Sequence, residues 1–195
     1  MKRKFRFDAG YYARHYPKGR GDAPPRRVLR LVDFVAAYLR HLELPVKRIL
    51  DIGCGRGSWR ARLEEHFPRA RYHGVELSRY LCDKYGWQQG SVVDYRSRVP
   101  FDLVICQGVL QYLDDVAAER ALANLAELCR GALYLEALTQ GDWLCNVDRA
   151  HTDGETYRRN VLWYKRRLMP HFTHAGGGLW LQNRADWVLF ELERG

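Results

Sequence analysis

The chain has 195 residues and a formal net charge of +9, and 47% of its residues are hydrophobic. This length suits about one domain with a substantial core. No run of about 18 apolar residues could span a bilayer, and no apolar stretch typical of a secretory signal follows the basic amino terminus. We therefore expect a soluble cytoplasmic protein with no membrane partner.

The five cysteines predict neither disulfides nor a metal site. They are odd in number and widely spaced, at positions 54, 82, 106, 129 and 145. No C-x-x-C pair or Cys/His cluster has the spacing of a zinc site, and the seven histidines are scattered. We expect reduced thiols.

The positive charge is concentrated near the amino terminus. Residues 1–30 hold ten Lys or Arg against two acidic side chains, which leaves +8, whereas the other 165 residues are almost balanced. Residues 1–25 also combine aromatic side chains with glycines and prolines, which disfavour regular structure. The pattern predicts a basic aromatic arm or lid over 1–25 and a main domain over 26–195.

The middle of the chain alternates between helical and strand patterns. Apolar residues at helical spacing predict a helix over 26–44, which Pro45 ends, and the apolar run at 49–52 predicts a buried parallel strand. In chain order we then expect a helix over 58–67, a strand over 71–75, a helix over 80–85, strands over 88–93 and 101–107, a helix over 115–129 with Gly131 as its C-cap, and a strand over 132–137. The link over 95–100 is too short for a full helix.

The last forty residues predict a different arrangement. A helix is expected over 157–169, ended by Pro170. Strands over 179–182 and 187–191, joined around 183–186, predict an antiparallel pair that the three glycines at 176–178 lead into. Together these elements make an α/β fold: a seven-stranded, mostly parallel sheet with helices on both faces and a C-terminal antiparallel strand pair.

A glycine-rich turn follows the first strand. Gly53, Gly55 and Gly57 leave the backbone without Cβ atoms, so its N–H groups can approach a ligand closely at the carboxyl end of the strand. The spacing is G-x-G-x-G, which differs from the G-x-G-x-x-G of dinucleotide-binding turns. An NAD-linked oxidoreductase is therefore disfavoured.

Asp51 together with these glycines resembles motif I of the class I S-adenosylmethionine-dependent methyltransferases. Further landmarks follow in order: Glu76 ends the second strand, Asp94 follows the third, and 101–113 resembles the family's fourth strand and turn. The resemblance covers roughly residues 45–137. It implies a Rossmann-like fold, methyltransferase activity and S-adenosylmethionine as the cofactor.

The resemblance also implies which residues contact the cofactor. Asp51 would face its amino group, Glu76 its ribose hydroxyls and Asp94 its adenine amino group. The alternatives are that Asp51 caps the turn, that Glu76 caps the helix beginning near Ser78, and that Asp94 is a solvated loop residue. The other implied contacts are Gly53, Cys54, Gly55, Gly57, Leu77, Val93, Gln107 and, in the arm, Tyr12, with Tyr11 and Arg14 as alternatives.

The sequence favours a small-molecule acceptor. After the fourth strand it reads Gln107-Gly108-Val109-Leu110, not the Asn/Asp-Pro-Pro-aromatic sequence of amino-methylating nucleic-acid enzymes. The basic arm supports an alternative, RNA binding or RNA methylation. His151 is the candidate general base, because a neutral imidazole accepts a proton near pH 7, and His15 and Tyr112 are the alternatives.

Overall fold

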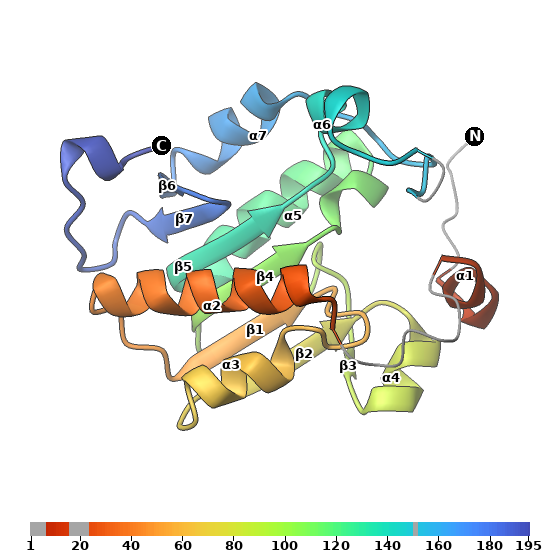
Figure 1. Ribbon diagram of the computed structural model, residues 1–195, viewed down its shortest axis with the longest axis horizontal. Helices are drawn as coiled ribbons and strands as arrows, with labels where there is room; N and C mark the ends of the chain where they lie inside the picture. Colours follow the sequence, from red (N-terminus) through yellow and green to blue (C-terminus); the bar gives the residue numbers. More distant parts are fainter. Residues whose placement is uncertain (1–6, 16–23, 150–151) are drawn as a thin grey trace.

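The computed structural model describes residues 7–15, 24–149 and 152–195. Seven strands form one sheet in the order β3-β2-β1-β4-β5-β7-β6 (Figure 1). They are β1 (Arg48–Ile52), β2 (Arg71–Glu76), β3 (Gln88–Gln89), β4 (Phe101–Gln107), β5 (Cys129–Glu136), β6 (Phe172–Gly176) and β7 (Leu179–Gln182). The first five are parallel, and β7 pairs antiparallel with both β5 and β6. The expected Rossmann-like sheet is confirmed.

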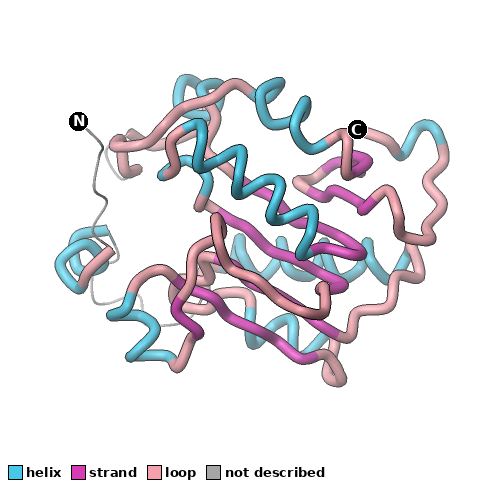
Figure 2. Tube along the Cα trace, turned by 180° about the vertical axis from the view of Figure 1, so that it is seen from behind, coloured by secondary structure: helices cyan, strands magenta, loops and turns pink. Residues whose placement is uncertain are grey.

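Helices cover both faces of the sheet (Figures 1 and 2). The helices are α1 (Ala9–His15), α2 (Arg26–His41), α3 (Arg60–His66), α4 (Arg79–Tyr85), α5 (Asp115–Leu128), α6 (Gln140–Cys145) and α7 (Val161–Leu168), with short 3-10 turns η1 (Leu110–Tyr112) and η2 (Glu191–Glu193). The core is divided accordingly, with α2 and α3 packed on one face and α5 and α7 on the other. No helix of the described residues is long and apolar enough to cross a membrane.

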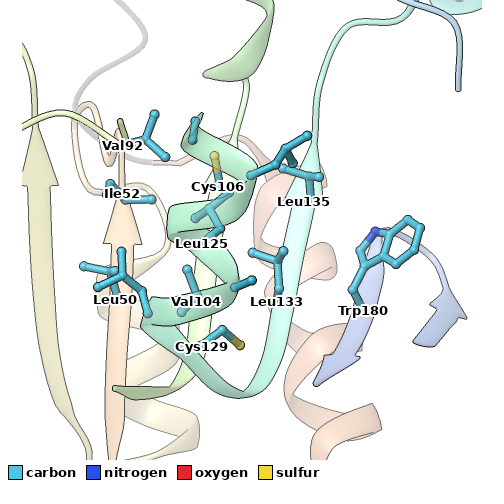
Figure 3. Packing of buried hydrophobic residues seen from close by; sticks show 14 of the residues in the cluster. Leu50, Ile52, Val92, Val104, Cys106, Leu125, Cys129, Leu133, Leu135 and Trp180 are labelled. Atoms are coloured by element: carbon cyan, nitrogen blue, oxygen red, sulfur yellow. The ribbon is translucent and has the colours of Figure 1, made fainter. Parts of the chain in front are cut away.

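The alternation along β4 shows how the sequence forms this double core. Leu103 and Ile105 are fully buried toward α2 and α3, whereas Val104 and Cys106 are fully buried toward α5. Figure 3 shows Val104 and Cys106 beside Leu125 of α5. A strand buried on both faces reads as a continuous apolar run, which is how 101–107 was predicted.

The predicted antiparallel pair at the carboxyl terminus is confirmed, and so is its strand over 179–182, but the second strand is not the predicted one. The structure pairs β6 with β7, and Gly176, Gly177 and Gly178, all at positive φ, form the turn between them rather than a lead-in. Residues 187–191 are not a strand. Instead Leu189 packs on the α2 face, and Trp187 donates its indole N–H to the carbonyl of Gln182 at 2.9 Å. A consecutive glycine triplet suits a tight hairpin, because L-residues disfavour positive φ.

Three other boundaries differ from the prediction. Gly131 is not a helix cap: α5 ends at Leu128, and a Cβ on Gly131 would lie 2.3 Å from the carbonyl oxygen of Asp102, so glycine lets β5 approach β4 at its bulge. Strand β3 has two residues instead of six, because 90–95 turn away under α5. Helix α7 begins four residues later than predicted, where the side chain of Asn160 caps it.

Candidate functional site

The turn between β1 and α3 is built on three glycines at positive φ, 78° at Gly53, 54° at Gly55 and 73° at Gly57. A Cβ on Gly53 would lie 2.3 Å from Val109, and one on Gly57 would lie 2.6 Å from the Trp87 ring. A Cβ on Gly55 would meet nothing within 4 Å. Two of these glycines therefore permit close packing inside the protein. Gly55 is the one with open space where a Cβ would stand, although its N–H donates to Glu76 and its carbonyl accepts from the Trp87 indole.

Glu76 holds this turn in place. Its side chain accepts hydrogen bonds from the backbone N–H of Gly55 and from that of Ser78, both at 2.8 Å, and it is 6% exposed. The carboxylate therefore joins the glycine turn to the start of α4, as the helix-capping alternative expects. A carboxylate offers about four acceptor positions, so it can accept further bonds from a ligand hydroxyl.

Asp51 lies at the end of the neighbouring strand and is 2% exposed. The hydroxyl of Tyr72 donates a hydrogen bond of 2.6 Å to its carboxylate. Burial raises the pKa of Asp51 to about 7; the bond from Tyr72 opposes the rise, and the charge of Glu76 adds to it. The carboxyl group thus changes its charge near neutral pH, and Tyr72 is a residue that the sequence did not single out.

Gln107 ends β4, and two neighbours fix its side chain. Its side-chain oxygen accepts from the indole of Trp59 at 2.8 Å, and its amide donates to Glu136 at 3.1 Å. Glu136 also accepts from the Tyr134 hydroxyl at 2.9 Å. The side chain is therefore engaged within the protein, which leaves the backbone carbonyl as the group predicted to meet a cofactor.

The other predicted contacts have varied surroundings. Cys54 is buried, and burial raises the pKa of its thiol well above the usual range, so it is an unreactive thiol. Leu77 is half exposed, Val93 packs at the edge of the α5-face core, and Asp94 is exposed in the turn after β3.

The carboxyl ends of parallel strands meet at one edge of the sheet, so Asp51, Glu76 and Gln107 lie along the same edge.

The described part of the amino-terminal arm lies across this edge (Figure 1). The hydroxyl of Tyr11 is 3.1 Å from that of Tyr112 and donates to Asp153 at 3.4 Å. The carbonyl of Phe7 accepts from the side chain of Ser78 at 2.5 Å. This segment therefore connects α4, η1 and the loop before α7. Tyr12 is 9% exposed, with its ring centroid 6.1 Å from that of Tyr80.

The three predicted candidates for the general base have different outcomes. His151 lies outside the described residues, and the side chain of His15 is also not described. Tyr112 lies at the carboxyl edge, where the Phe7 ring meets it edge-on at 5.1 Å. The prediction for His151 remains untested.

Arg159 is a structural residue that the sequence analysis missed. It is 6% exposed and donates to the carbonyl oxygens of Leu110 at 3.1 Å and Leu113 at 2.5 Å. Its Nε also donates to Asp115 at 2.8 Å, and its guanidinium lies 4.6 Å from the Trp163 ring centroid. One side chain thus fixes η1 against the loop that precedes α7. The chain contains many arginines, so the only signal in the sequence that sets Arg159 apart from the others is the presence of aromatic residues near it.

Comparison with known proteins gives a consistent result. Residues 50–131 match the family model described as "Methyltransferase domain". Two curated relatives, both named trans-aconitate 2-methyltransferase, are 33% identical over 76 residues (Azoarcus sp. strain BH72) and 32% identical over 96 residues (Deinococcus radiodurans). The matches cover 35% and 45% of this chain but only 30% and 36% of those proteins.

A solved structure is similar over most of the chain. It is magnesium protoporphyrin IX methyltransferase from Synechocystis PCC 6803 with bound SAH, with a TM-score of 0.64 and 21% identity over 89% of this chain and 94% of that one. At this identity the similarity shows a shared fold over that part of the chain.

Proposed function

We propose that the chain is a class I S-adenosylmethionine-dependent methyltransferase, which uses the methyltransferase domain matched over residues 50–131 to transfer a methyl group from S-adenosylmethionine to a small-molecule acceptor. The observation that supports this most directly is the open space beside Gly55, in a turn that Glu76 holds near the buried carboxyl group of Asp51.

The residues present fit this cofactor. When bound, it supplies a methyl group on a sulfonium, which is already electrophilic. The cofactor could approach the chain closely at Gly55, Asp51 would accept a bond from its ammonium group, and Glu76 would offer its remaining acceptor positions to the ribose. The task left to the protein is alignment and the exclusion of water, which can lower a barrier by roughly 7 to 11 kcal/mol at best.

The acceptor would enter beside the aromatic side chains that cover the carboxyl edge. Tyr11, Tyr112 and Phe7 present rings there, and an aromatic surface of this character suits a small organic molecule. The names of the two curated relatives support a small-molecule acceptor as well.

The proposal is tested by methyl transfer with labelled S-adenosylmethionine. The purified full chain is incubated with a small-molecule extract and, separately, with total RNA. We expect label in the small-molecule fraction and a higher melting temperature when S-adenosylhomocysteine is added. No melting shift at millimolar S-adenosylhomocysteine would refute cofactor binding, and label in RNA alone would refute the acceptor class.

A further inference from the structure

A groove lies at the opposite edge of the sheet from the cofactor turn. The loop before β1 and the turn before β2 lie side by side at the amino ends of these strands, far from α1 (Figure 1). The backbone N–H of Arg71 donates to the carbonyl of Lys47 at 2.9 Å, and Arg48 stands opposite Arg71 in the strand register. Between these segments is a groove of about 510 Å³, lined by Pro45, Val46, Lys47, Arg48, Arg69 and Arg71.

The four cations of this groove have no anionic partner in the described part of the chain. None of the ion pairs found there involves Lys47, Arg48, Arg69 or Arg71. Asp102 lies under the same loop, but its carboxylate is 9% exposed and accepts from the backbone N–H groups of residues 47 and 48 and from Arg130. Its charge is therefore already matched, and the groove is left strongly positive.

Two buried polar atoms near the groove have no hydrogen-bond partner among the described residues, one on Arg48, which lines the groove, and one on His73, which does not line it. The guanidinium of Arg48 lies over the Phe101 ring at 4.7 Å, so the side chain is held in one orientation, and its buried Nε has no hydrogen-bond partner among the described residues. The ring of His73 lies 5.2 Å from the same Phe101, and its buried Nε2 is likewise unpartnered there. Buried polar groups are normally hydrogen-bonded, so such atoms indicate a ligand or ordered water.

We propose that this groove binds a small anion that carries two or more phosphate groups. Four positive side chains around a cavity of about 510 Å³ match the charge and size of such a ligand. Arginine forks pair with phosphate oxygens in two parallel hydrogen bonds, and three of the four cations are arginines. The described part of the arm lies at the other edge of the sheet, so the groove is not continuous with that part (Figure 1).

The test measures binding of inorganic pyrophosphate to the full chain by calorimetry at low salt. The variant is Arg69→Ala/Arg71→Ala, which removes two exposed side chains from the groove. The matched control is Arg120→Ala/Arg166→Ala, which removes the same charge from exposed positions on α5 and α7. We expect the affinity for pyrophosphate to fall about tenfold or more in the first variant and to stay within about twofold in the second, since a charge-assisted hydrogen bond contributes about 1.5 to 3 kcal/mol.

Citrate and a single-stranded RNA oligonucleotide serve as competing probes. The proposal is overturned if pyrophosphate does not bind, if the control pair loses as much affinity as the groove pair, or if citrate binds as tightly as pyrophosphate. It is also overturned if RNA, and not pyrophosphate, depends on Arg69 and Arg71, because the surface would then recognise nucleic acid. A melting curve of each variant shows that it is folded.

Discussion

The carboxyl group of Asp51 is the residue-scale feature with the clearest consequence. Its pKa in the folded protein is raised to about 7, so the folded state binds more protons than the unfolded state between about pH 4 and pH 7. This contribution to stability is present at low pH and is lost as the pH rises through that window. Asp51 is therefore ionised at a cost to stability, which suits a carboxylate that awaits a cationic ligand.

We predict that cofactor affinity rises with pH because of Asp51. If binding of the ammonium group requires the ionised form, the affinity for S-adenosylhomocysteine should increase about tenfold between pH 6 and pH 8 and then level off. Asp51→Asn should bind more weakly and without this pH dependence, as calorimetry at three pH values would show.

Tyr72→Phe provides the companion measurement. It removes a hydrogen bond that favours the ionised form of Asp51, so the midpoint of the pH dependence should move upward. Tyr95→Phe is the control, because the Tyr95 hydroxyl makes no hydrogen bond among the described residues. A pH profile that is the same in Asp51→Asn as in the unmodified chain would exclude this account.

At the scale of elements, the strands and the glycine turn could be predicted, because burial on both faces and G-x-G-x-G spacing are local signals. The partners of the last strands could not be predicted this way. The strand pattern at 179–182 allows pairing with the segment before it or with 187–191. The turn at Gly176 favours the segment before it, and the packing of Leu189 on the α2 face keeps 187–191 out of the sheet. Tyr72 and Arg159 were missed because their partners are 21 and 44 to 49 residues away in the sequence.

Arg159 allows a test of how the elements after β4 and β5 are held together. Arg159→Met keeps the packing on Trp163 but leaves the carbonyls of Leu110 and Leu113 without their donor, so the free energy of unfolding should fall by roughly 2 to 4 kcal/mol. Because η1 borders the acceptor side, turnover should fall further than affinity for S-adenosylhomocysteine.

Arg158→Met is the matched control for that change. Arg158 is the adjacent residue and donates to one carbonyl, that of Gly154, from a half-buried position. Its loss should cost about 1 kcal/mol or less in chemical denaturation. Equal losses in the two variants would show that Arg159 has no special part in fixing η1.

At the scale of the whole molecule, the sheet separates two surfaces of different chemistry. The carboxyl edge presents carboxylates, an open glycine and aromatic rings, whereas the amino edge presents a groove with four cations that form no ion pair with any described residue. The first could be located from the sequence, because residues that follow parallel strands meet at one edge. The second depends on the β1–β2 register, which brings Arg48 beside Arg71.

The most direct test of cofactor binding compares alanine at Gly55 with alanine at Gly86. Both glycines have positive φ, 54° and 73°, and a Cβ at either would meet nothing within 4 Å. Both substitutions should therefore cost a similar backbone strain of roughly 1 to 2 kcal/mol. Calorimetry with S-adenosylhomocysteine should show a loss of about tenfold or more for Gly55→Ala, since its Cβ enters the proposed ligand space, and little change for Gly86→Ala at the end of α4. Equal affinities in both variants would contradict the placement of the cofactor at this turn.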